Sequence, residues 1–110
     1  MIFAVETEER TLMTFLSEAE AVAYCEGLDV EAAVWLFWND RGDPLEPRFS
    51  VPNKHGLFVV RNGVYSLVSA APDHHAILDE AIDEVLTFVG PDPFNSAEGI
   101  RAYIRRARAA

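Results

Sequence analysis

Six consecutive residues without a polar side chain, Ala33 to Trp38, most constrain how this chain folds. Periodicity alone does not separate a strand from a buried helix in so short a run. The Val, Trp and Phe content and the turn-forming "NDRGDP" that follows favour a strand, expected over residues 29–38. Trp35 and Phe37 would face one side and Trp38 the other, so both faces need a cover. We expect the chain's own helices to supply it, with a partner protein as the alternative.

The N-terminal part predicts a hairpin followed by a capped helix. Two β-prone runs, residues 2–5 and 11–15, flank the charged "ETEER". Ser17 followed by Glu20 is a capping-box pattern, in which hydroxyl and carboxylate satisfy free N–H groups at a helix start. Gly27 is expected to end this helix as its C′ residue.

Two further strand signals lie in the middle of the chain. Residues 45–51 are expected to form a strand, and Pro44, Pro47 and Pro52 place it towards a sheet edge. Asn62-Gly63 separates "GLFVV" from "VYSLVSA" and is a strong hairpin signal, so these two runs are expected to pair.

Helical spacing begins after Asp73. Apolar residues recur from Ile77 to Val89 with acids on the opposite face, which predicts an amphipathic helix of about four turns. Asn95 and Glu98 form a second capping box before a last helix. The residues expected to face inward on that helix are Ile100, Tyr103, Ile104 and Ala107.

These elements follow the order ββαββββαα in a single domain, residues 1–110. Because strands and helices are partly segregated, we expect an α+β fold rather than a βαβ arrangement. Its antiparallel sheet would have about five to six strands, packed by about two to three helices.

Charge narrows the choice of partners. The chain has eighteen acidic and nine basic residues, a net charge of −9, and four of the basic residues lie in the last ten positions. Such a surface repels nucleic acid and anionic membranes and attracts basic partners. The single cysteine, Cys25, forms no internal disulfide, and no leader-like or membrane-spanning segment stands out. We expect a soluble cytoplasmic protein that binds neither nucleic acid nor membrane.

Catalytic patterns are weak. His75, Asp79 and Asp83 would share a helix face and could hold a metal ion, although His74 would point about 100° away. Other paired carboxylates lie on predicted polar faces or turns, and His55 has no visible partner. The chain has no nucleophile elbow and no glycine-rich phosphate loop. We therefore expect a binding protein without cofactor or metal, rather than an enzyme.

Two alternatives stay open beside this expectation. One is a small metal-binding or hydrolytic enzyme that uses His74, His75 and the carboxylates of the following helix. The other is a homo-oligomeric structural domain whose edge strand at residues 45–51 pairs with its copy, which the prolines in that strand disfavour.

The pattern over residues 1–70 resembles a known group of proteins. A hairpin, a capped "S-x-x-E" helix, "GLDVE" and an aromatic strand ending in "FWNDRGDPL" follow one another. A "DVE…(Y/F)…D-x-x-G" segment recurs in that group, and residues 29–31 with 37–45 match it. The chain thus resembles the small immunity proteins encoded beside bacterial polymorphic toxins, including those of contact-dependent inhibition and type VI secretion.

The resemblance implies that the protein neutralises a cognate toxin by tight binding, without catalysis. Many such toxins are nucleases or nucleotide-modifying enzymes with basic active sites, which an acidic partner reaches quickly by electrostatic steering. We expect Trp35 to lie in the core and the acidic turn after residue 38 to form the docking rim. The expected contact residues are Trp38, Asp40, Arg41, Asp43, Glu46 and Glu31.

Overall fold

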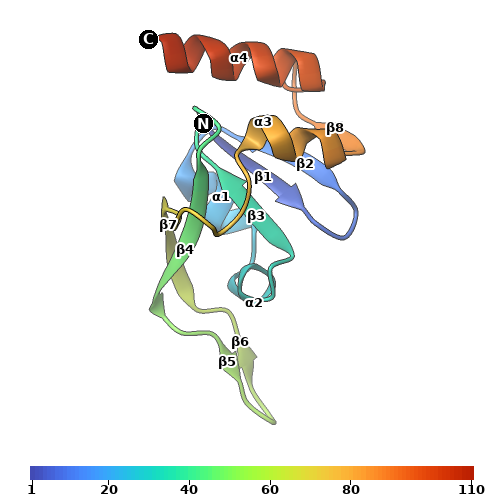
Figure 1. The fold of residues 1–110 in the computed structure, drawn as a ribbon. Coiled ribbons are helices and arrows are strands. Elements are labelled where there is room, and N and C mark those ends of the chain that lie inside the picture. The colour runs from blue at the N-terminus through green and yellow to red at the C-terminus, as the bar shows by residue number, and fades with distance from the viewer.

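The computed structural model describes all 110 residues and confirms the α+β class. A six-stranded sheet has the order β7-β4-β3-β1-β2-β8 and is antiparallel except where β8 pairs with β2, and β5 and β6 form a separate hairpin (Figure 1). The elements are β1 (Ile2–Glu6), β2 (Thr11–Phe15), α1 (Glu18–Tyr24), α2 (Gly27–Glu31), β3 (Trp35–Trp38), β4 (Pro44–Val51), β5 (Lys54–His55), β6 (Val60–Arg61), β7 (Val64–Ser69), α3 (Leu78–Ala81), the 3₁₀ helix η1 (Ile82–Glu84), β8 (Thr87–Val89) and α4 (Ala97–Ala109). None of the helices has the length and apolarity needed to cross a bilayer.

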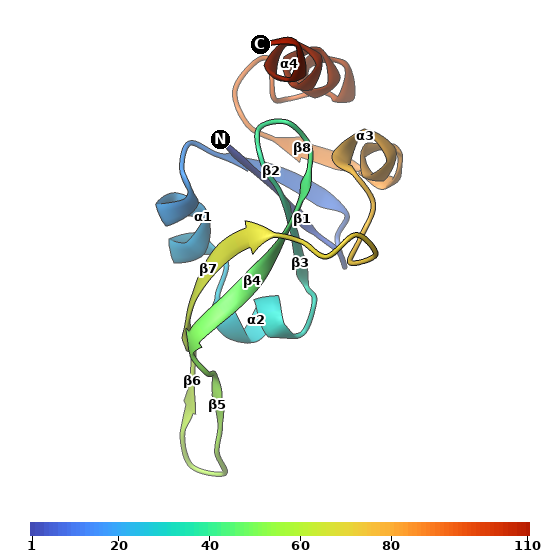
Figure 2. The same cartoon turned by 60° about the vertical axis from the view of Figure 1, so that its left-hand side comes forward.

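Helices cover both faces of the sheet, and each face has its own core (Figure 2). Trp35 and Phe37 of β3 join the core under α1 and α2, whereas Trp38 joins the core under α3, η1 and α4. The expected internal cover of this apolar strand is therefore confirmed. The strand is shorter than predicted, because residues 29–31 belong to α2.

The N-terminal hairpin and the start of α1 are as predicted. Strand β1 pairs with β2 from Ile2 opposite Phe15 to Glu6 opposite Thr11. The Ser17 hydroxyl accepts a hydrogen bond from the Glu20 N–H at 3.2 Å, and the Glu20 carboxylate accepts one from the Leu16 N–H at 3.2 Å. Two free donors at the helix start are thereby satisfied.

The predicted four-turn helix over residues 77–89 is wrong. Helical structure ends at Glu84, and residues 87–89 form β8, which runs parallel to β2. The sequence "VLTFV" at 85–89 is rich in β-forming residues, and its apolar spacing fits either structure. The free edge of β2 decides the outcome. If residues 85–89 continued the helix, the backbone N–H and C=O groups along that edge of β2 would lack the partners that β8 supplies.

Asn62-Gly63 is not the turn of a hairpin. Strand β6 pairs with β5, and β7 pairs with β4, so this dipeptide is the corner between two pairings. A Cβ atom at Gly63 would overlap the carbonyl oxygen of Val51, so only glycine fits.

Strand β4 lies inside the sheet, between β3 and β7, and not at the edge that its prolines suggested. The short β3 pairs only with Pro44 and Leu45 of this strand. The pairing with β3 stops at Leu45, so Pro47 lies past the paired positions and its missing N–H leaves no ladder partner unsatisfied on that side.

Residues 52–63, which we call the arm, project from the body and stretch the molecule to 47 × 25 × 24 Å (Figures 1 and 2). Helix α2 holds the arm at its base. The Asn53 amide donates to the Gly27 carbonyl at 2.9 Å and accepts from the Gly63 N–H at 2.6 Å, while the Asn62 side chain accepts from the Leu28 N–H at 3.0 Å.

Gly27 therefore begins α2 instead of ending α1. A Cβ atom at this position would lie 2.7 Å from the Asn53 side-chain oxygen, so the glycine permits the close approach of the arm. The last helix also begins one residue later than predicted. Its N-cap is Ser96, which accepts from the Gly99 N–H at 3.1 Å, and its buried face is formed by Ile100 and Ile104.

Candidate binding groove

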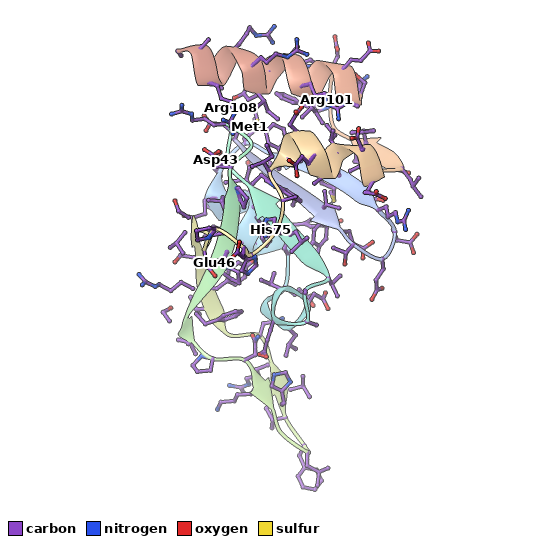
Figure 3. The ribbon with its side chains drawn as sticks, viewed as in Figure 1. Met1, Asp43, Glu46, His75, Arg101 and Arg108 are labelled. Carbon is purple, nitrogen blue, oxygen red and sulfur yellow. The ribbon has the colours of Figure 1, made fainter.

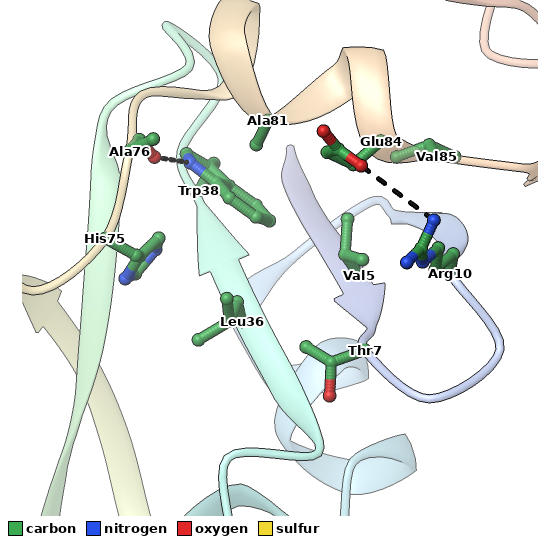
Figure 4. A pocket seen from close by; sticks show the side chains of 10 residues that line it. All are labelled: Val5, Thr7, Arg10, Leu36, Trp38, His75, Ala76, Ala81, Glu84 and Val85. Atoms are coloured by element: carbon green, nitrogen blue, oxygen red, sulfur yellow. Dashed lines mark hydrogen bonds and ion pairs between the residues drawn. The ribbon is translucent and has the colours of Figure 1, made fainter.

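An open apolar groove of about 390 Å³ lies on the α3 side of the sheet (Figure 4). Its floor comes from alternate positions of β1 and β3, because side chains two residues apart in a strand point to the same face. These floor residues are Val5, Leu36 and Trp38. Ala81 and Val85 close one side. The groove offers a ligand apolar surface over most of its lining.

The polar groups of the groove mostly bond to one another or to the backbone. Arg10 and Glu84 form an ion pair at 3.8 Å. The Thr7 hydroxyl donates to the carbonyl groups of Ala33 and Val34, at 3.0 and 3.1 Å.

His75 lies in the wall with its ring edge against Trp38, at 5.0 Å between ring centres. Its Nε2 donates to the Phe37 carbonyl at 3.0 Å, and its Nδ1 lies 2.7 Å from Nδ1 of His74. Burial lowers the pKa of His75, against the opposing effect of the Phe37 hydrogen bond. A neutral His75 that donates from Nε2 accepts the His74 proton at Nδ1, so neither ring nitrogen is free for a ligand.

The predicted metal face of His75, Asp79 and Asp83 does not form. His75 precedes α3 instead of lying on a helix, and both aspartates bind Arg101 of α4, at 3.1 and 2.7 Å. No group of three or more His, Cys, Asp or Glu side chains is arranged to hold a metal ion. His74 instead faces Glu46, at 3.7 Å.

The six expected contact residues do not form one exposed surface, because they differ in burial and most have partners within the chain. Trp38 is 1% exposed and donates from its indole N–H to the Ala76 carbonyl at 2.8 Å, so it lies in the core and forms part of the groove floor instead of standing on the exposed turn. Asp43 is paired with Arg108 at 2.7 Å. Only Asp40 and Arg41 are exposed without an ion pair of their own.

The other two expected contact residues also have partners within the chain. The Glu46 carboxylate accepts from the Ala71 N–H at 3.1 Å in addition to facing His74. Glu31 is 2.9 Å from Nε2 of His55, which corrects the expectation that this histidine has no partner. The hydrogen bonds from Asn53 and His55 lower the pKa of Glu31.

Unpaired acidic residues flank the groove on two sides. Only six of the eighteen acidic side chains take part in ion pairs, which leaves twelve without one. Glu8 and Glu9 are exposed in the turn between the lining residues Thr7 and Arg10. Glu80 is exposed one turn before Glu84 on the opposite side.

Sequence patterns identified these carboxylates only as solvated pairs. What these carboxylates share is their position beside one apolar groove. That groove brings together residues 5–10 and residues 75–85, which lie about seventy positions apart in the chain. The sequence matches no protein family model, no curated protein and no solved structure. What the groove binds is therefore inferred from its lining residues and charges.

Proposed function

We propose that this protein is an immunity protein, which binds and neutralises a cognate bacterial toxin in the cytoplasm without catalysing a reaction. The observation that carries the proposal is the apolar groove with exposed acids that have no ion pair beside its lining residues, Glu8 and Glu9 in one segment and Glu80 in the other. An apolar centre within a charged rim is the usual anatomy of a protein–protein interface. The resemblance of residues 1–70 to immunity proteins supports the same function.

The charge supports a basic partner. Twelve carboxylates without an ion pair create a negative field that accelerates association with a positive surface. Toxins that act on nucleic acids or nucleotides carry positive charge where phosphate binds. The acidic rim of the groove would take the place of phosphate there.

The polar side chains of the groove already have partners within the chain, which supports binding over catalysis. A general base needs a free lone pair within hydrogen-bond reach of its substrate. Both ring nitrogens of His75 are engaged by Phe37 and His74, and Arg10 and Glu84 neutralise each other.

Co-expression in bacteria tests the proposal. The probe is the variable C-terminal domain of the protein encoded directly upstream, produced with and without this chain. We expect the wild-type protein to restore growth and the Glu80→Lys/Glu84→Lys variant to lose most of that protection. Asp92→Lys/Glu98→Lys makes the same charge change outside the groove and should protect fully. Continued killing despite abundant wild-type protein would contradict the proposal.

A further inference from the structure

The arm ends in apolar side chains that its own chain leaves uncovered. Leu57 and Phe58, which we call the tip, are 90% and 93% exposed, and Val59 and Val60 behind them are also exposed. Single exposed apolar residues are common, but a run of four at the far end of a molecule is not. Such a run is typical of an element that is buried in another molecule.

The arm is also basic, in contrast to the rest of the chain. Residues 47–72 contain Arg48, Lys54 and Arg61 and no acidic residue, so all eighteen acids lie elsewhere. Lys54 and Arg61 are direct cross-strand partners, which places both cations at one level behind the tip. An apolar tip followed by two cations fits an apolar cavity with carboxylates at its mouth.

The arm is held in one orientation before anything binds it. Asn53 joins its base to Gly27 and Gly63, and His55 on β5 contacts Glu31 of α2. A preorganised element loses less conformational entropy on binding than a free loop.

The groove on the body has an apolar floor, and its lining holds the ion pair of Arg10 and Glu84. Exposed acids stand next to the lining residues in sequence, Glu8 and Glu9 between Thr7 and Arg10, and Glu80 before Ala81. The arm points away from the body, at the end opposite α4, so a chain does not place its tip in its own groove (Figures 1 and 2). We propose that the tip of one copy occupies the groove of a second copy, and that reciprocal exchange closes a dimer. This dimer is a property of the free protein, and because the tip and a toxin would use the same groove, a toxin would have to displace the tip to bind.

Sedimentation velocity of the full chain over a range of concentrations tests the proposal. We expect a dimer at about 50 mM salt that weakens at about 500 mM, because the attraction between cations and carboxylates is screened. Leu57→Ser/Phe58→Ser should raise the dimer dissociation constant by about 100-fold or more, since two buried anchors are lost. Leu16→Ser, at a residue 74% exposed elsewhere, is the matched control and should leave the dimer intact.

Charge exchange identifies the contact itself. Lys54→Glu/Arg61→Glu and Glu80→Lys/Glu84→Lys should each break the dimer, and mixing the two variants should restore association. A wild-type protein that is monomeric throughout, or a dimer unaffected by the tip substitutions, would overturn the proposal. Tip-dependent binding of a monomer to phosphatidylserine vesicles would also overturn it and assign the tip to lipid. Growth protection by the tip variant, measured separately, distinguishes the two proposals, because the tip variant loses the dimer but keeps the groove residues intact.

Discussion

Arg108, in the last turn of α4, binds Asp43 in the turn between β3 and β4. Its Nη2 donates to the Asp43 carboxylate and its Nε to the Arg41 carbonyl, both at 2.7 Å. The C-terminal helix is thereby joined to the turn that we expected to form the docking rim (Figure 3). The acidity of this turn is partly neutralised within the chain, and the free carboxylates of the rim lie at the groove instead.

Replacement of Arg108 by Ala should have a small effect on stability. Both partners are about half exposed, and exposed ion pairs contribute below about 1 kcal/mol. Urea unfolding should show a loss within that limit that shrinks at high salt, and Arg106→Ala, without an ion pair, should show almost none. A much larger loss would mean that the contact organises α4 as a whole.

Replacement of Asn53 by Ala should loosen the arm without unfolding the sheet. The Asn53 amide joins the arm to Gly27 and Gly63, and its loss leaves these backbone groups to water. Hydrogen exchange over residues 54–62 should accelerate, while exchange in β1 and β3 stays unchanged. Asn95→Ala is a control outside the arm. Equal protection of the arm in both variants would show that Asn53 does not hold it.

Stability should fall at alkaline pH because of Cys25. Burial, aided by the charge of Asp29, raises the pKa of its thiol from 9.0 to about 12. Above about pH 9 the unfolded chain releases this proton and the folded chain keeps it, so unfolding becomes easier by about 1.4 kcal/mol per pH unit. Urea titrations from about pH 8 to about pH 11 should show the stability falling with a slope that approaches this value above about pH 10, and Cys25→Ala should flatten it. Equal slopes would contradict burial of the thiol.

Stability should also fall on acidification because of His75. Its pKa lies below the ordinary value of 6.5, so the unfolded chain takes up a proton before the folded chain does. The contribution is complete above pH 6.5 and declines as the pH drops below it. His75→Gln, which keeps a donor for the Phe37 carbonyl, should reduce the decline in urea titrations.

Local sequence predicted the parts of the fold that local chemistry determines. The capped start of α1 depends on Ser17 and Glu20, and the turn after Trp38 depends on Asn39, whose side chain accepts from the N–H groups of Arg41 and Asp43. The alternation along β3 also placed Trp35 and Phe37 correctly.

Failures arose where a distant segment decides the structure. Residues 85–89 form a strand because β2 leaves an edge free, which their own spacing does not reveal. Asn62-Gly63 has the composition of a hairpin turn but forms the corner between β6 and β7, where hydrogen bonds to Leu28 of α2 and to Asn53 hold it. The groove also depends on a distant contact, between the first hairpin and η1. The sequence therefore predicted exposed carboxylates but not the groove beside which they lie.

The central claim is that an acidic-rimmed groove binds a basic toxin. The most direct measurement is the association rate of the purified protein with the toxin domain that the co-expression test identifies, at increasing salt. We predict a one-to-one complex whose association rate falls about tenfold or more at high salt and in Glu80→Lys/Glu84→Lys. Asp92→Lys/Glu98→Lys should change the rate much less. Absence of a complex, or a rate indifferent to salt and to the groove variant, would contradict the claim.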